Sequence, residues 1–261
     1  MKEMHLVSAR IEKNDCISPD IFHMEIYAPE IAKTARAGQF VMVYLDKSEL
    51  LLPRPISLCD ANHETGTIEL VYQVVGKGTK VMSEILPKQQ IKLLGALGNG
   101  FFTEGKNGKK FNRAALVGGG IGAPPLYFLA KNLVKNETRV DIFLGFRTAP
   151  ILVEKFRAIT QGEIFIATED GSVGHHGRVT EILAERNEKY DEILACGPAP
   201  MLRALADYAL NSKIPCQICM EERMACGLGT CVGCVVKVGE SYVRVCSEGP
   251  VFYADEVNLN G

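Results

Sequence analysis

The chain has 261 residues, of which 47% are hydrophobic, and a formal net charge of -2 with its lysines and arginines scattered. This length suits two ordinary domains with room for a small third, and the charge gives no reason to expect nucleic acid or an anionic membrane as partner. No signal-like apolar region and no uncharged apolar run of about 18 residues occurs, so we expect a cytoplasmic protein that neither crosses nor binds a membrane.

Short strands dominate the first part of the chain. Apolar and polar residues alternate over 22–26, and further strand patterns follow at 38–45, 67–75 and 89–95, separated by glycine and proline. No amphipathic helix interrupts them convincingly. We therefore predict a small antiparallel β-barrel over residues 1–103.

The pattern changes after the lysine- and glycine-rich run at 104–110, which has linker composition. Strands and helices then alternate, with strands expected at 114–117, 140–146, 163–168 and 192–198, and helices over 126–133, 179–184 and 201–210. This alternation predicts a parallel α/β domain over 111–212. The remainder, 213–261, is predicted to be a small cysteine-rich domain, which makes the whole an α+β multidomain chain.

Four cysteines near the C-terminus follow the spacing C-x4-C-x2-C-x11-C, namely Cys226, Cys231, Cys234 and Cys246. The first three match the plant-type pattern for a 2Fe-2S cluster. Glycines between them let the backbone wrap closely and point N–H groups at the sulfurs. The spacing favours an iron–sulfur cluster and hence electron transfer.

Two other interpretations of the cysteines stay open. Cys216 and Cys219 could join Cys231 and Cys234 as a zinc ribbon, although that leaves two cysteines of the spacing unused. Buried, unliganded thiols are the second alternative.

The run VGGGIGAPP follows a predicted strand and opens a predicted helix. Its candidate dinucleotide-binding residues are Gly118, Gly119, Gly120 and Gly122, whose N–H groups could hold a pyrophosphate. A tight turn that needs glycine only for packing is the alternative. The acidic residue usual at the end of the next strand is absent, and Arg147 stands there instead, suited to a 2′-phosphate or simply solvated.

A second candidate for the nicotinamide site is Cys196-Gly197-Pro198, at the end of another predicted parallel strand. Ligands of open α/β sheets bind at this edge. The thiol either borders a nicotinamide ring or fills space as a small apolar group.

Three runs in the first part have chemistry suited to a flavin nucleotide. Arg54-Pro55-Ile56-Ser57 offers a guanidinium for a diphosphate and a hydroxyl for a ring nitrogen, or is a polar strand start. Tyr72 either stacks on a cofactor or is a half-buried strand residue. The turn 76–79 either cradles a phosphate or is an ordinary hairpin.

Taken in order, RPIS, GKGT, GGGIGAPP and CGP resemble the ferredoxin-NADP reductase superfamily. With MEERMACGLGTCVGC and VCSEGPVF added, essentially the whole chain resembles the electron-transfer subunits of class B, NAD-dependent dihydroorotate dehydrogenases. The resemblance implies NAD as a cofactor, a 2Fe-2S cluster on the four cysteines, and FAD held by Arg54, Pro55, Ile56, Ser57, Val71, Tyr72, Gln73, Gly78 and Thr79.

The resemblance also implies a partner: an FMN-containing catalytic subunit that oxidises dihydroorotate in pyrimidine biosynthesis, in a heterotetramer. No eightfold βα repeat is present to build a dihydroorotate site here, so we name no catalytic residue in this chain. Two other functions stay open, a reductase subunit that serves an oxygenase or a transhydrogenase partner, and a zinc-ribbon protein that senses nucleotides.

Overall fold

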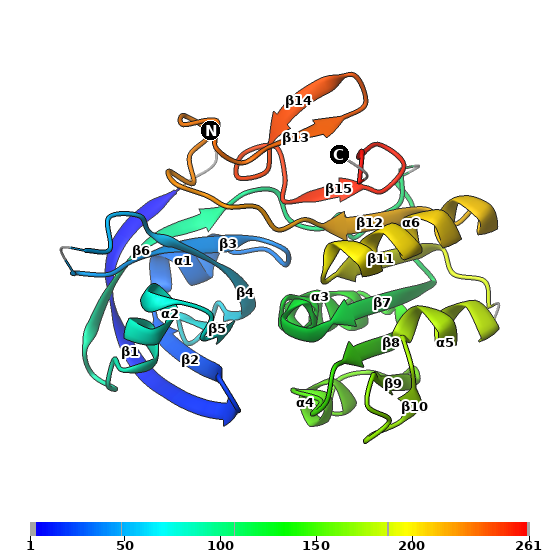
Figure 1. Ribbon diagram of the computed structural model, residues 1–261, viewed down its shortest axis with the longest axis horizontal. Helices are drawn as coiled ribbons and strands as arrows, with labels where there is room; N and C mark the ends of the chain where they lie inside the picture. Colours follow the sequence, from blue (N-terminus) through cyan, green and yellow to red (C-terminus); the bar gives the residue numbers. More distant parts are fainter. Residues whose placement is uncertain (1–3, 48, 107, 187, 260–261) are drawn as a thin grey trace. The chain divides into compact units, whose positions relative to one another are not determined.

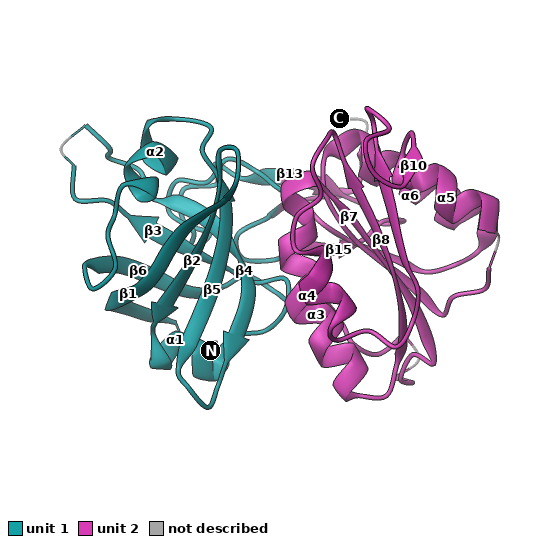
Figure 2. Ribbon diagram, turned by 90° about the horizontal axis from the view of Figure 1, so that it is seen from below, with its two compact units in different colours: residues 1–100, 221–235, 244–250 teal, residues 101–220, 236–243, 251–261 magenta. Residues whose placement is uncertain are grey.

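The computed structural model describes residues 4–47, 49–106, 108–186 and 188–259 (Figure 1). The chain forms two compact units, coloured separately in Figure 2. Unit 1 comprises the chain up to Gly100 together with Glu221–Val235 and Arg244–Pro250. Unit 2 comprises Phe101–Met220, Val236–Val243 and the chain from Val251 onward.

Unit 1 is built on a closed barrel with the strand order β1-β2-β5-β4-β3-β6, all pairs antiparallel. The strands are β1 His5–Ser18, β2 Ile21–Tyr27, β3 Phe40–Tyr44, β4 Arg54–Asn62, β5 Thr67–Gln73 and β6 Gln90–Leu97. Alternate apolar side chains fill the interior, with Met24, Ile26 and Leu70 fully buried. The predicted antiparallel barrel is confirmed.

Two short helices lie in unit 1, α1 Pro29–Thr34 and α2 Lys77–Ser83. Each is too short to repeat a 3.6-residue apolar pattern, which is why the sequence did not reveal them. Helix α2 begins at the predicted turn 76–79, with Gly76 as its N-cap. The hairpin alternative for that run is therefore wrong.

Unit 2 contains a mixed sheet with the order β10-β9-β8-β7-β11-β12-β15 in the described part of the chain. Its strands are β7 Arg113–Gly119, β8 Arg139–Phe146, β9 Ile164–Thr168, β10 His175–His176, β11 Glu192–Cys196, β12 Cys216–Cys219 and β15 Val251–Tyr253. Only β15 pairs antiparallel, with β12. The predicted parallel α/β arrangement is confirmed, and its central strands are buried apolar runs, as expected with helices on both faces.

The helices of unit 2 are α3 Ala123–Lys135, α4 Val153–Arg157, α5 Val179–Arg186 and α6 Ala199–Ser212, with a 3₁₀ turn, η1, at Gly120–Gly122. Figure 2 shows α3 and α4 on one face of the sheet and α5 and α6 on the other. None of the described helices is long and apolar enough to cross a membrane.

The cysteine-rich C-terminal segment does not form a compact unit of its own, which differs from the predicted division at 1–103, 111–212 and 213–261. β12 and β15 extend the sheet of unit 2, while Glu221–Val235 and Arg244–Pro250 belong to unit 1. A two-stranded hairpin, β13 Val235–Val238 and β14 Ser241–Arg244, joins those two stretches. The segment is too short to bury a core, so its apolar side chains are buried against larger units. In the linker run, Asn107 lies outside the described residues.

Candidate functional site

The predicted flavin motifs RPIS and GKGT come together in unit 1. Arg54 begins β4, and Gly78 lies in the first turn of α2. A Cβ built on Gly78 would lie 1.9 Å from Nε and 2.4 Å from Cζ of Arg54, so the guanidinium group covers this glycine directly. Arg54 Nη1 also donates to the carbonyl oxygen of Leu52. Gly78 thus leaves room for the Arg54 guanidinium, a cation suited to a diphosphate.

The start of β4 is partly open to solvent. Arg54, Pro55, Ile56 and Ser57 are all of intermediate exposure, whereas barrel strands normally alternate between buried and exposed positions. This half-exposed run, next to the covered Gly78, provides a surface on which a flat nucleotide can lie.

Tyr72 does not offer a ring to a cofactor. Its side chain is 2% exposed, its ring stacks on Phe22 with centroids 5.8 Å apart, and its hydroxyl donates to Asn14 Oδ1 over 2.9 Å. Burial raises its pKa above the ordinary tyrosine value. The stacking hypothesis for Tyr72 is wrong; Val71 is buried too, and only Gln73 of this run exposes its side chain.

The hydroxyl of Thr79 is used by the helix itself. Its Oγ1 accepts from the N–H groups of Val75 and Gly76, at 2.9 and 3.2 Å, and donates to the Gly76 carbonyl. Thr79 therefore fixes the start of α2, the turn that contains Gly78.

The glycine loop and the CGP run meet at the carboxyl edge of the unit 2 sheet, where Cys196 pairs with Gly118. A Cβ on Gly122 would lie 2.4 Å from the Cys196 carbonyl oxygen, and one on Gly119 would lie 2.8 Å from Cδ of Pro198. Close packing thus explains these two glycines.

Gly120 differs from the other glycines of the loop. Its φ is +53°, and no neighbouring atom lies within 4 Å of a built Cβ. It leaves open backbone at the edge of the sheet where α/β proteins commonly bind nucleotides.

Arg147 follows β8 at the same edge and is exposed. Two acidic residues follow the adjacent β9: the N–H of Glu169 donates to the Phe146 carbonyl, and that of Asp170 to the Arg147 carbonyl. Ser172 holds Asp170 through N–H and hydroxyl hydrogen bonds of 3.0 and 2.7 Å. Sequence inspection missed these carboxylates because they lie one strand beyond the usual position.

The cluster cysteines stand as two contacting pairs in unit 1. Cys226 and Cys231 lie close enough to shift each other's ionisation, as do Cys234 and Cys246. Among the described residues, no set of three or more His, Cys, Asp or Glu side chains is gathered in a metal-holding arrangement.

Backbone N–H groups do point at the sulfurs of these pairs. The Leu228 N–H donates to Cys226 Sγ over 3.3 Å, and the Cys246 N–H donates to Cys234 Sγ over 3.4 Å. Partial burial opposes ionisation of Cys226, but the Thr230 hydroxyl and loop N–H groups lower its pKa to about 6. Cysteine sulfurs that accept hydrogen bonds from backbone N–H groups fit an iron–sulfur cluster.

The cluster loop, residues 226–234, rests on the barrel. Gly227 has φ +70°, and a Cβ built on it would lie 2.6 Å from Cγ and 3.0 Å from Sδ of Met42. Met42 is fully buried in β3 and pairs with Pro55 of the RPIS run on β4. The loop that carries three of the four predicted cluster cysteines therefore packs against β3, the strand next to the RPIS run on β4.

Strand geometry argues against the zinc ribbon. Cys216 and Cys219 stand three positions apart in β12, so their side chains point to opposite faces of the sheet. They cannot both reach one metal ion as a ribbon pair does.

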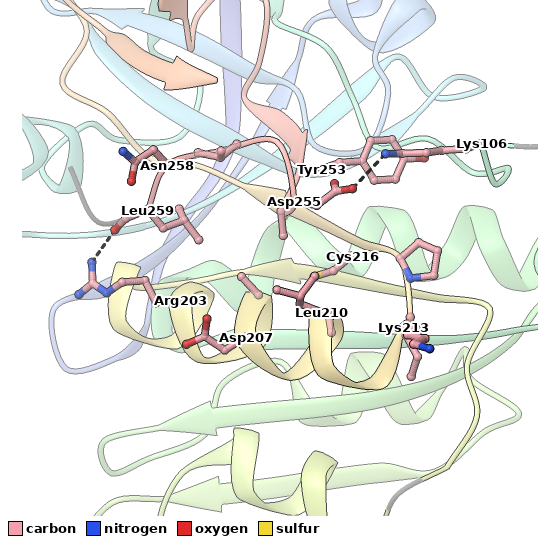
Figure 3. A pocket seen from close by; sticks show the side chains of 16 residues that line it. Lys106, Arg203, Asp207, Leu210, Lys213, Cys216, Tyr253, Asp255, Asn258 and Leu259 are labelled. Atoms are coloured by element: carbon pink, nitrogen blue, oxygen red, sulfur yellow. Dashed lines mark hydrogen bonds and ion pairs between the residues drawn. The ribbon is translucent and has the colours of Figure 1, made fainter. Parts of the chain in front are cut away.

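A pocket of ≈ 550 Å³ lies in unit 2 between α6 and residues 253–259, with Cys216 at its wall beside Leu210 (Figure 3). Burial raises the pKa of the Cys216 thiol, as expected of a small apolar group. The lining includes none of the residues predicted to bind flavin, nicotinamide or cluster.

Residues 221–258 match the family model described as the iron-sulfur cluster binding domain of dihydroorotate dehydrogenase B. The chain is 46% identical over 235 residues to the "Dihydroorotate dehydrogenase B (NAD(+)), electron transfer subunit" of Geobacillus kaustophilus, covering 88% of this chain and 89% of the relative. The protein of the same name from Caldanaerobacter subterraneus is 40% identical over 256 residues, 96% of this chain and 98% of that one.

Two solved structures show the same fold. A structure of an NADH-dependent reduced ferredoxin-NADP oxidoreductase, described in connection with flavin-based electron bifurcation, superposes with a TM-score of 0.87 at 30% identity, covering 97% of this chain and 91% of that one. A ferredoxin NADP+ reductase from Neisseria gonorrhoeae with bound FAD and NADP gives a TM-score of 0.66 at 16% identity, covering 79% and 91%. The second likeness concerns the fold alone.

Proposed function

The chain belongs to the family of electron transfer subunits of NAD(+)-dependent dihydroorotate dehydrogenase B, and from this premise we propose that it carries electrons between NAD and the flavin of a catalytic partner. Its cofactors are FAD, NAD and a 2Fe-2S cluster. The observation that carries the proposal is the adjacency of the cluster loop and the RPIS run, which Met42 joins by contacting Gly227 and pairing with Pro55.

Bound FAD supplies the required chemistry, since it exchanges a hydride with a nicotinamide and single electrons with an iron–sulfur cluster. In this chain Arg54 would neutralise the flavin diphosphate, and the absence of a side chain at Gly78 leaves the room in which that guanidinium lies. The open Gly120 and the edge at Cys196 would receive the dinucleotide, while Cys226, Cys231, Cys234 and Cys246 would hold the cluster.

Exposed apolar side chains around the cluster loop support a partner surface there. Leu228, Val232 and Val235 are 43%, 61% and 37% exposed, and Val232 has φ +50°, an unusual conformation for a β-branched residue. A catalytic subunit that carries FMN and oxidises dihydroorotate would cover this surface, in a heterotetramer.

Two measurements test the proposal. A visible spectrum of anaerobically purified protein is expected to show flavin and iron–sulfur absorption, which a zinc ribbon lacks. The isolated chain is expected to reduce artificial acceptors with NADH without oxidising dihydroorotate, and to couple dihydroorotate to NAD reduction once mixed with the catalytic subunit. Dihydroorotate oxidation by the chain alone, or no coupling in any mixture, would contradict it.

A second candidate function is a subunit of a flavin-based bifurcating transhydrogenase, favoured by the 0.87 TM-score to the NADH-dependent reduced ferredoxin-NADP oxidoreductase structure. The choice of partner separates the two functions. The second function requires turnover with a ferredoxin- and NADP-linked subunit and no turnover with a subunit that oxidises dihydroorotate. Cytoplasmic location remains a prediction from the sequence.

A further inference from the structure

Arg244, at the end of β14, forms a cluster of contacts beside the cysteines. Its Nε donates to Glu248 Oε2 over 3.0 Å, Nη2 donates to the other carboxylate oxygen, and Nη1 donates to the Gly229 carbonyl over 3.0 Å. The N–H of Arg244 also donates to Glu248 Oε2, over 2.7 Å. A bidentate pair of this kind fixes the orientation of the guanidinium plane.

Gly229 is thereby held from two sides. On one side, its carbonyl accepts a hydrogen bond from Arg244 Nη1. Its φ is +80°, and a Cβ built on it would lie 2.9 Å from Ser247 Oγ, so the loop passes tightly over the turn that carries Cys246. Ser247 in turn donates its hydroxyl to Glu248 Oε2 over 2.9 Å.

We propose that Arg244, locked by Glu248, is a positioning residue that sets the reduction potential of the cluster by holding the loop at Gly229 against the turn that carries Cys246. The inference rests on the proposed function, because it requires a cluster on the four cysteines. It adds a residue that the cysteine spacing does not reveal.

Two effects of Arg244 act in the same direction. Reduction adds a negative charge to the cluster, and both a nearby cation and N–H donors to sulfur stabilise that charge. Losing Arg244 removes the cation and releases the Gly229 carbonyl. The midpoint potential is therefore expected to become more negative.

The experiment compares Arg244→Gln, Arg244→Lys and the control Lys237→Gln in the full-length protein with its cluster. Lys237 is 39% exposed, close to the 40% of Arg244, and its nearest carboxylate oxygen, on Glu240, lies 3.9 Å away. The readouts are iron content, an EPR-monitored redox titration and the g values of the reduced cluster.

Arg244→Gln is expected to lower the ratio of reduced to oxidised cluster at fixed potential by about tenfold, about 59 mV for a one-electron couple. Arg244→Lys keeps the charge but cannot bridge Glu248 and Gly229 as a rigid fork. Its midpoint potential is therefore expected to fall nearly as far as that of Arg244→Gln, and its g values are expected to change. Lys237→Gln is expected to match the wild type.

Wild-type potential and g values in Arg244→Lys would overturn the positioning role, because the charge of residue 244 would then account for the whole effect. An equal shift in Lys237→Gln, or no shift in Arg244→Gln, would also overturn it. If Arg244→Gln takes up no cluster, Arg244→Lys decides the question. A wild-type protein without a 2Fe-2S signal would instead contradict the proposed function.

Discussion

The guanidinium of Arg54 covers Gly78 so closely that no side chain can stand at position 78 without displacing it. The two residues come from separate motifs, one at the start of β4 and the other in α2. Their contact fixes the cation of Arg54 over the buried Gly78, at the half-exposed start of β4, where a diphosphate could meet it.

Arg54→Ala is expected to weaken FAD binding by about 1.5–3 kcal/mol, the usual contribution of a charge-assisted hydrogen bond. Fluorescence titration of the deflavinated protein measures this. Arg10→Ala serves as the matched control, because Arg10 is an exposed barrel arginine paired with Glu12. Unchanged flavin affinity in Arg54→Ala would show that RPIS is only a strand start.

Gly78→Ala is expected to weaken FAD binding as Arg54→Ala does, because the new Cβ would lie 1.9 Å from Arg54 Nε. The double variant should lose clearly less than the sum of the single losses, since both changes remove the same contact. Additive losses would mean that the two residues act on the flavin independently.

Cys231→Ser is expected to abolish the cluster, whereas Cys216→Ala should retain it, because Cys216 faces the α6 pocket. Iron and sulfide analysis with the visible spectrum separates them. Equal metal loss in both variants would restore the ribbon interpretation. Flavin retention in Cys231→Ser is a separate readout, since the cluster loop and the flavin motifs share unit 1.

Gly227→Ala is expected to destabilise the cluster loop by at least about 1–2 kcal/mol, the cost of a left-handed backbone conformation for a residue with a Cβ. The new methyl group would also approach Met42 Cγ at 2.6 Å. Combining it with Met42→Ala should relieve the steric part. Urea unfolding monitored by cluster absorbance gives the stability of the wild type, the two single variants and the double variant. If the effects of the two substitutions simply add, the contact between Gly227 and Met42 is contradicted.

NADH is expected to be preferred over NADPH, because the backbone hydrogen bonds of Glu169 and Asp170 to Phe146 and Arg147 bring two acidic residues next to the arginine that a 2′-phosphate would have to use. Glu169→Gln with Asp170→Asn should raise kcat/KM for NADPH relative to NADH by about fivefold, which corresponds to about 1 kcal/mol of relieved repulsion. Steady-state reduction of an artificial electron acceptor by NADH and by NADPH gives the ratio of the two kcat/KM values. Equal use of both nucleotides by the wild type would assign Arg147 to phosphate recognition.

Glu192 is expected to make stability fall as pH rises from 4.5 to about 7. Its side chain is 1% exposed, and burial raises its pKa to about 7 despite a hydrogen bond from Gln217. In this pH range the folded protein keeps a proton that the unfolded chain has lost. The free energy of unfolding therefore falls by at most about 3 kcal/mol.

Glu192→Gln should remove this pH dependence while keeping the shape of the side chain. Thermal melts of the two proteins from pH 4.5 to 8 check this expectation. The Tm of the variant should rise relative to the Tm of the wild type as the pH increases. Parallel melting curves would show that Glu192 ionises normally.

Much of the fold follows from local pattern. Alternation over residues such as Phe22 to Ile26 requires a strand with one buried face, and the apolar runs around Leu116 and Phe143 require a sheet covered on both sides. The short helix at Lys77–Ser83 was not predictable, because its formation depends on the Thr79 cap and on burial of Met82 rather than on periodicity.

Some features of the candidate site likewise follow from local sequence, and others depend on the tertiary structure. Residue type and spacing alone determined which cysteines are fit to hold a cluster and which glycines open a nucleotide loop, because those properties depend on neighbours along the chain. Only the tertiary structure decided that Arg54 covers Gly78, that Met42 lies between Gly227 and Pro55, that Arg244 holds Gly229, and that Tyr72 is buried on Phe22. Each of these depends on which strands pair and in what register, and that is set by burial of the whole barrel rather than by any local sequence.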